Sequence, residues 1–230
     1  MKILTSFDTL TTLTASSAAS GYAASNVVNL DPGKRWKGSI FASDTDEWLK
    51  VDFGAAKSLT ALFLNNCNFA TCKIQGNASD SWADPSYDED VTLALDDISN
   101  RKGWFDLTAF NYRWLRILIP WQVLDSLGTY PMVGNLIFGT SQSIIVGGWD
   151  VQLIKASTVF VSDGGSFSKT PRGIPRHVFI AAMEGTLAEI EALSLAWTMA
   201  VIYEDLGTVA RSWLVYAPDA PRKKIYSSAY

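Results

Sequence analysis

The sequence predicts a mainly β protein, in which an antiparallel sandwich over residues 1–140 precedes a smaller α+β domain over residues 141–230. Short apolar or alternating runs, separated by turn-prone residues, recur to about residue 180 without an intervening helical period. A polar stretch at 139–143 then marks the expected boundary between the two domains. Behind it, apolar residues recur once at helical spacing. This order is typical of a sandwich followed by a mixed domain.

The strands of the first part follow from alternation and turn residues. In Trp48–Phe53, Leu49 and its apolar partners point to one side and charged residues to the other, which predicts a half-buried strand. Gly54 ends it, and the apolar run Ser58–Leu64 predicts a second strand. Further strands are expected at Cys72–Gln75, Val91–Leu95, Trp104–Leu107, Arg113–Ile119 and Asn135–Phe138.

The second part combines strands with one helix. Strands are expected at Trp149–Ile154, Ser157–Val161 and Val209–Tyr216. Between them, Leu187–Ala200 has helical apolar spacing, and Thr186 with Glu189 makes a capping box at its start. We expect this helix to pack against a small sheet formed by the flanking strands.

Four motifs in order carry a resemblance to a known family. They are the opening loops with Gly21–Val28, Asp31 and Trp36, the strand Glu47–Gly54, the segment Cys72–Asn77 with Trp82, and the strand Tyr112–Ile117. Over about residues 15–139 the chain resembles the discoidin, or galactose-binding-like, domains. The resemblance implies an antiparallel jelly-roll sandwich.

Discoidin-like domains bind glycans, lipid headgroups or proteins with loops at one end of the sandwich. Here those loops would be Gly21–Asn26, Lys34–Phe41 and Asn65–Thr71, and the candidate ligand-binding residues are Tyr22, Trp36, Asn66, Asn68 and Phe69. In the alternative interpretation, Trp36 fills a core position and the asparagines satisfy turns. Many relatives bind calcium beside the first loop, but Lys34 and Arg35 place positive charge there, so no metal is expected.

Asp52 and Arg116 are charges within otherwise apolar strands. Because an unpaired buried charge is costly, we expect them to form a structural ion pair.

Composition excludes several classes of function. The net charge of −4 and scattered Lys and Arg give no footprint for nucleic acid. No apolar run reaches about 18 residues, so no membrane insertion is expected, and Phe7 and Asp8 interrupt the region where a secretion signal has its apolar core.

Cys67 and Cys72 are expected as buried thiols, with a strained disulfide as the alternative. With a single histidine they make no standard zinc site, and no cofactor is expected.

The sequence shows no catalytic set. His177 has no accompanying nucleophile motif. The acidic groups Asp44/Asp46, Asp88/Glu89/Asp90 and Asp96/Asp97 are expected in solvated loops, and they leave a glycoside hydrolase open as an alternative.

Segments of the second part, including Trp149–Val151, Ser168–Gly173 and Tyr203–Gly207, resemble small tail proteins of long-tailed bacteriophages. The resemblance implies a non-enzymatic virion protein of the tail tip or baseplate, made in the host cytoplasm, with copies of itself, other tail proteins and a host-surface glycan as partners. The alternative is a free carbohydrate-binding module. An assembly contact is expected at Arg222, Lys223, Lys224 and Tyr226, and the alternative there is a disordered terminus.

Overall fold

The computed structural model describes residues 2–4, 12–28, 34–39, 45–95, 100–125, 129–143, 145–154, 157–161, 167–171, 176–184, 199–205 and 210–216, with side chains described up to residue 143. The first strands are β1 (Lys2–Leu4), β2 (Thr12–Ala15), β3 (Trp36–Lys37), β4 (Glu47–Cys67), β5 (Thr71–Asn77), β6 (Tyr87–Thr92), β7 (Ala94–Leu95), β8 (Arg101–Ile119), β9 (Met132–Val133) and β10 (Asn135–Gly139). The later strands are β11 (Gln142–Ser143), β12 (Ile145–Ile154), β13 (Ser157–Val161), β14 (Phe167–Pro171), β15 (Arg176–Glu184), β16 (Met199–Asp205) and β17 (Ala210–Tyr216). A short 3₁₀ helix, η1 (Ala24–Val28), lies in the first loop region.

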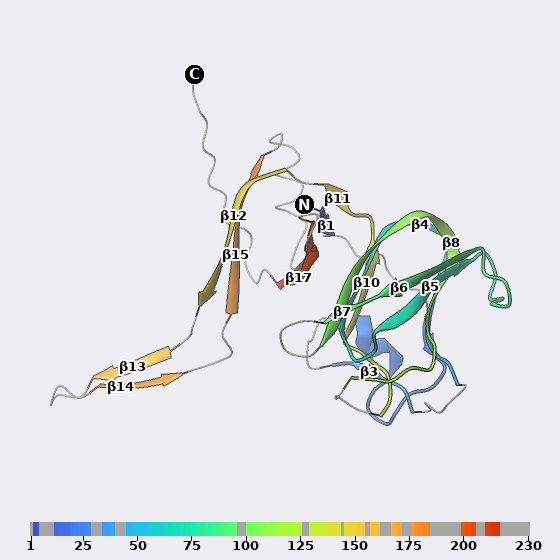
Figure 1. Cartoon of the computed structure of the whole chain (residues 1–230), viewed down its shortest axis with the longest axis horizontal. Coiled ribbons are helices and arrows are strands. Elements are labelled where there is room, and N and C mark those ends of the chain that lie inside the picture. The colour runs from blue at the N-terminus through green and yellow to red at the C-terminus, as the bar shows by residue number, and fades with distance from the viewer. Residues whose placement is uncertain are drawn as a thin grey trace, which may run out of the picture.

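The described residues are mainly antiparallel β-sheet, as predicted, and their arrangement is consistent with a β-sandwich (Figure 1). The main sheet has the strand order β10-β4-β8-β5-β6, with β2 paired to β4 and β7 paired to β8. The short pair β3 and β9 lies at one end of the sandwich, next to η1.

Two long strands pass from one layer of the sandwich to the other. The sequence predicts separate strands at Trp48–Phe53 and Ser58–Leu64, but β4 runs through both. Gly54 adopts a left-handed φ of 76°, and the pairing with β8 shifts register between Asp52 and Lys57. A left-handed glycine and a bulge bend a strand without ending its ladder. β8 likewise joins two predicted strands through Ala109, whose φ is 55°.

The core lies between these layers and follows the predicted alternation. On β4, Leu49, Val51 and Phe53 are buried, and on β8, Leu115 and Ile117 are buried opposite them. The alternate residues of β4, including Trp48 and Lys50, point away from the core and form the outer face of the sheet. The core is closed by buried side chains from the loops and short strands, among them Val27, Trp36, Phe69 and Val133.

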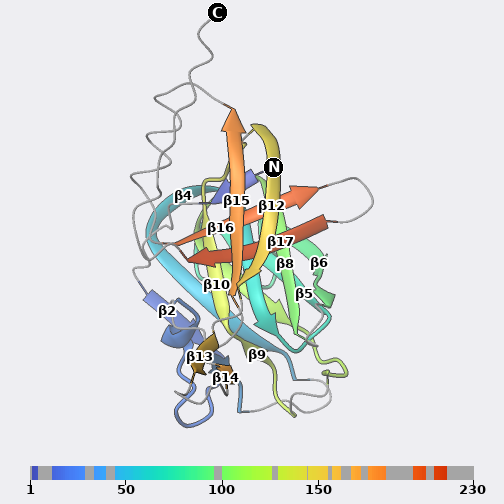
Figure 2. The same cartoon turned by 90° about the vertical axis from the view of Figure 1, so that its left-hand side faces the viewer.

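The first strand of the chain belongs to a sheet of the later residues. β1 pairs with β11 and β16, and β17 completes this small sheet, whose strands run across the direction of β12 and β15 in Figure 2. Leu4 of β1 is nevertheless buried with Phe63, Trp104 and Ile137 on the sandwich. β1 therefore connects the two parts.

The strands expected in the second part have counterparts in β12, β13 and β17. β12 pairs with β15, which contains His177, and β13 pairs with β14. Residues 187–198 of the predicted helix lie outside the described residues, while Met199 and Ala200 begin β16 instead of continuing a helix. The predicted assembly contact at 222–226 also lies outside the described residues.

Candidate functional site at the loop end of the sandwich

Three chain segments meet at the end of the sandwich where β4 begins. Backbone hydrogen bonds join them: the Ala19 N–H donates to the Lys37 carbonyl at 2.9 Å, and the Gly38 N–H donates to the Pro131 carbonyl at 3.0 Å. The β3–β9 pair adds the register Lys37 opposite Met132. Residues distant in sequence are therefore held together at this end.

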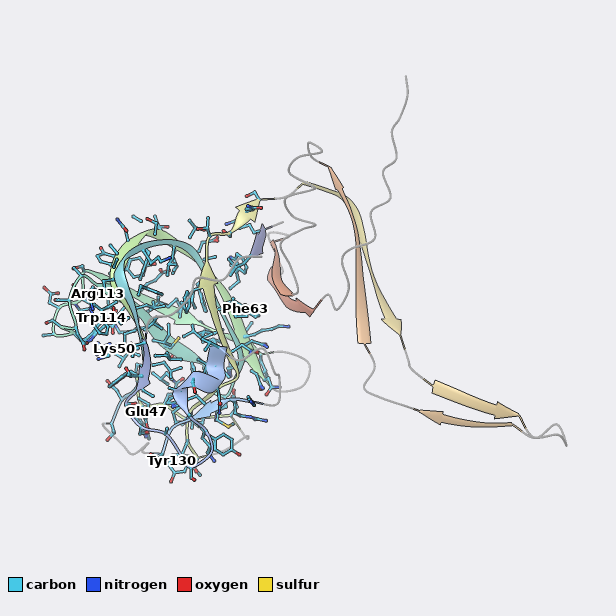
Figure 3. All side chains as sticks on the ribbon, turned by 180° about the vertical axis from the view of Figure 1, so that it is seen from behind. Glu47, Lys50, Phe63, Arg113, Trp114 and Tyr130 are labelled. Atoms are coloured by element: carbon cyan, nitrogen blue, oxygen red, sulfur yellow. The ribbon has the colours of Figure 1, made fainter. Side chains whose placement is uncertain are left out.

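A cluster of Tyr22, Lys37 and Tyr130, here called the tyrosine–lysine cluster, lies at this end. The Lys37 Nζ lies 5.8 Å from the Tyr22 ring centroid and 5.4 Å from the Tyr130 ring centroid. Tyr22 is 40% exposed. Figure 3 shows Tyr130 at the end of the sandwich, below Glu47. Cation–π contacts at this distance fix the lysine between the two rings.

Two of the predicted ligand-binding residues lie in the interior. The Trp36 side chain is completely buried, and its indole N–H donates to the Ser17 carbonyl at 2.8 Å. Phe69 is completely buried in the core. In this conformation neither ring has a face that a ligand could reach. The buried position of Trp36 fits the alternative interpretation, in which it fills a core position, and Phe69 belongs to the same core.

Asn68 is also completely buried, but it organises the loop end. Its Nδ2 donates to the Tyr130 carbonyl at 2.9 Å, and its Oδ1 accepts from the Met132 N–H at 2.8 Å. The Asn68 carbonyl accepts from the Asp125 N–H at 2.8 Å. Asn68 thus fixes the segment that carries Tyr130 and positions the cluster without facing solvent.

Asn66 is half-buried and lies near the end of β4, at a register shift with β8. It adopts a left-handed φ of 56°, a conformation that asparagine tolerates better than most residues. Its carbonyl accepts from the Gly134 N–H at 3.2 Å. Of the five predicted ligand-binding residues, only Tyr22 is exposed at the loop end.

A carboxylate lies beneath the tyrosine–lysine cluster. Glu47 is buried and accepts hydrogen bonds from the hydroxyls of Ser16 and Ser17. A side chain at position 38 would place its Cβ 2.8 Å from the Glu47 Oε1, so Gly38 permits this close packing. The arrangement fixes the loop between β2 and β3 against the start of β4.

The outer face of the sheet carries tryptophans interleaved with cations. The Lys50 Nζ lies 5.0 Å from the Trp48 ring and 5.3 Å from the Trp114 ring, and its ammonium pairs with Asp80 at 2.7 Å. Lys50, Trp114 and Arg113 lie on the side of the sandwich opposite Phe63 (Figure 3). These half-buried rings are already covered by cations, which favours a structural role.

The predicted ion pair of Asp52 with Arg116 is wrong. Asp52 pairs with Arg113 at 2.8 Å, and this bond lowers the pKa of the Asp52 carboxyl to about 2. Arg116 donates from Nε to Gln75 at 2.7 Å and stacks on Trp82, with 4.4 Å between its Cζ and the ring centroid. The cross-strand register explains the difference, because Arg116 lies opposite Lys50 while Asp52 lies opposite Trp114.

Sequence reasoning missed Tyr130 and Lys37. Lys37 lies within the predicted loop Lys34–Phe41 but was not among the candidate residues, and the only available signal for Tyr130 was an aromatic residue before a proline in a loop. Both become recognisable once the β3–β9 pair brings their segments together.

The described cysteines and acidic residues form no reactive or metal-binding group. Cys67 and Cys72 are free and buried, as expected, and burial raises the pKa of both thiols, which keeps them protonated and unreactive. Asp88, Glu89 and Asp90 lie on edge strand β6, not in a loop as expected. No cluster of three metal-ligating side chains occurs among the described residues, and no helix there could span a membrane.

No model of a known protein family matches the chain, and no curated protein is significantly similar. Among solved structures, the third family-32 carbohydrate-binding module of a Clostridium perfringens family 31 glycoside hydrolase aligns at a TM-score of 0.44 with 16% identity, over 55% of this chain and 90% of that one. A chitosan-binding module of a Paenibacillus chitosanase/glucanase aligns at 0.40 with 19% identity, over 55% and 92%.

Larger proteins also contain similar parts. The Clostridium perfringens ZmpB structure, with two family-32 modules and a catalytic domain, gives a TM-score of 0.47 with 7% identity over 56% of this chain. A Ruminococcus gnavus fucosidase gives 0.45 with 14% identity over 57%. The chain spans only 14% and 25% of these two structures. Each TM-score lies below 0.5, so these likenesses do not establish a function.

Proposed function

We propose that this chain is a non-enzymatic, discoidin-like carbohydrate-binding module that contacts a sugar through the loop end of its sandwich. One observation carries the proposal: Tyr22 and Tyr130, from separate loops, flank the Lys37 ammonium at the exposed end. The function thus corresponds to the module that was the alternative interpretation of the sequence.

The chemistry of the tyrosine–lysine cluster fits a sugar. A sugar ring has apolar C–H faces and a rim of hydroxyls, and a tyrosine offers an apolar ring with a polar tip. The Lys37 ammonium has three N–H donors for hydroxyl oxygens. Within the described residues no carboxylate forms an ion pair with Lys37, so these donors are available to a ligand.

The support beneath the cluster lowers the cost of binding. The buried hydrogen bonds of Asn68 fix the Tyr130 segment, and that of Trp36 fixes the segment before Tyr22. A site whose loops are ordered before the ligand arrives loses less conformational entropy on binding. The buried members of the predicted set therefore contribute to binding indirectly.

The two other hypotheses have less support. A glycoside hydrolase needs two carboxylates that converge on a substrate. However, Glu47 is buried against two serine hydroxyls, and Asp88 bonds to Lys73 and Gln75 on the outer face. The virion hypothesis remains a prediction, since no described contact bears on it.

Binding to an array of neutral and acidic glycans, followed by calorimetry, tests the proposal. Tyr22→Ala and Tyr130→Ala should each weaken binding of the best glycan about tenfold, which corresponds to about 1.4 kcal/mol. Matched controls are Tyr112→Phe and Lys57→Met, at the bend of the sandwich away from the loop end. Failure of the parent to bind any glycan, or full binding by both alanine variants, would refute the proposal.

A further inference from the structure

Trp121 differs from the other described tryptophans. It is 48% exposed, and it is the one tryptophan among the large exposed apolar residues of the described part of the chain. Trp48, Trp82 and Trp114 each carry a cation 4.4 to 5.3 Å from the ring. No cation or aromatic ring among the described residues contacts Trp121. Its indole is therefore both exposed and uncovered.

The backbone that carries Trp121 is firmly fixed. The next residue, Gln122, accepts from the N–H groups of Ala70 and Thr71 at 2.9 and 3.0 Å, and it donates to the Thr71 carbonyl at 2.7 Å. Three residues further on, Asp125 pairs with Arg101. An exposed indole on a fixed loop is a preorganised surface, because little ordering remains to be done when a ligand stacks on it.

A carboxylate lies beside the backbone of Trp121. The Trp121 backbone N–H donates to the Asp46 Oδ1 at 3.3 Å, and Asp46 is exposed immediately before the start of β4. A carboxylate accepts several hydrogen bonds and matches a pair of neighbouring hydroxyls. Asp46 would also repel a ligand with its own negative charge.

We propose that Trp121 and Asp46 form a second sugar-binding subsite, which takes a sugar unit without negative charge. The sugar stacks its C–H face on the indole and donates hydroxyls to Asp46. This subsite shares with the proposed function only the class of ligand, because none of its residues belongs to the tyrosine–lysine cluster. A module with two subsites would bind oligosaccharides more tightly than single sugars.

A variant at Val123 can distinguish a sugar-binding subsite from a surface that docks a protein. It is 85% exposed and lies two residues from Trp121 on the same loop. A protein partner that covered the loop would bury Val123 as well, whereas a sugar held by an indole and a carboxylate gains little from a valine. Val123→Ala is therefore the matched control.

The experiment measures binding of neutral gluco-, galacto- and N-acetylglucosamine oligosaccharides to the full chain, with uronic acid oligomers for comparison. Trp121→Ala and Asp46→Asn should each weaken neutral oligosaccharide binding about tenfold, and Val123→Ala should leave it unchanged. Uronic acid oligomers should bind less well than their neutral counterparts. Bound oligosaccharide should also protect the parent, but not Trp121→Ala, from iodide quenching of tryptophan fluorescence.

The outcomes separate this subsite from the loop-end cluster. Loss of binding in Trp121→Ala with retention in Tyr22→Ala supports the subsite and overturns the cluster. Retention in Trp121→Ala with loss in Tyr22→Ala overturns the subsite and leaves the proposed function standing. Equal loss in Val123→Ala and Trp121→Ala, or a preference for uronic acids, overturns the subsite. A parent that binds none of the oligosaccharides overturns both.

Discussion

Asp52 forms a two-point ion pair with Arg113, in which the Arg113 Nε and Nη2 each donate to one carboxylate oxygen at 2.8 Å. The Asp52 carboxylate also accepts from the Gly54 N–H at 2.8 Å, next to the left-handed residue where β4 bends. The pair therefore lies where the long strand passes from one layer to the other. Its position suggests that it stabilises the bend.

Replacing Arg113 should change the titration of Asp52. In the parent, the bond to Arg113 holds the pKa of Asp52 near 2. In Arg113→Met the pKa should rise toward the usual value of about 3.9, as measured by NMR titration of the side-chain carboxyl. The matched variant Arg116→Met should leave it near 2. A rise in Arg116→Met instead would show that the longer-range charge dominates.

The same pair should make stability depend on pH. Because the pKa of Asp52 is lower in the folded than in the unfolded chain, its contribution is present above about pH 4 and is lost as the pH falls toward 2. Solvent at the exposed Arg113 keeps this contribution small. Urea unfolding of Asp52→Asn should therefore differ from the parent at pH 6 and converge with it at low pH. Parallel curves would contradict this.

Asp80 should matter through the two cations that it faces. Lys50 and Arg116 lie directly opposite each other on β4 and β8, a like-charge pair that is unfavourable by itself. Asp80 binds Lys50, and this bond lowers the pKa of the Asp80 carboxyl. Asp80→Asn should cost about 0.5 kcal/mol, and more at low salt. Asp84→Asn, in the same loop, is the control, and an equal loss in both variants would contradict the argument.

Gly76 should tolerate no side chain. A Cβ at this position would lie 2.6 Å from Phe110 and 2.8 Å from Tyr112, within the packed aromatic group that includes Tyr87. Gly76→Ala should destabilise the chain by about 1 to 3 kcal/mol through overpacking. Thermal unfolding measures this, and Gly21→Ala, with open space around it and a φ of 83°, isolates the cost of the backbone alone. If both variants lose the same stability, overpacking is not the cause.

Alternation in the sequence was sufficient to predict which residues of Trp48–Phe53 on β4 face the core, because every second residue of a strand points to the same side. It was not sufficient to predict which charges meet. Whether Asp52 reaches Arg113 or Arg116 depends on the register between two strands and on a bulge, and neither leaves a local signal in the sequence. The loop end shows the same limit, since Asn68 reads as a turn residue until its partners in the 130–132 segment are known.

Leu4 should connect the first strand to the sandwich, and its replacement tests whether β1 depends on that contact. The Leu4 side chain is completely buried with Phe63, Trp104 and Ile137, although β1 pairs its backbone with β11 and β16. Removing most of a buried leucine costs about 2 to 5 kcal/mol, because the transfer free energy is lost and a cavity remains. In Leu4→Ala we expect β1 to detach locally while the rest of the chain stays folded, since only a three-residue strand has to separate. We therefore expect limited proteolysis to cleave near the N-terminus of Leu4→Ala while the sandwich stays folded. Lys2→Ala, which removes only an exposed ion pair to Asp106, is the control and should resist cleavage like the parent. Cooperative unfolding of the whole chain in Leu4→Ala, without a cleavage intermediate, would show that β1 is an integral part of the sandwich core.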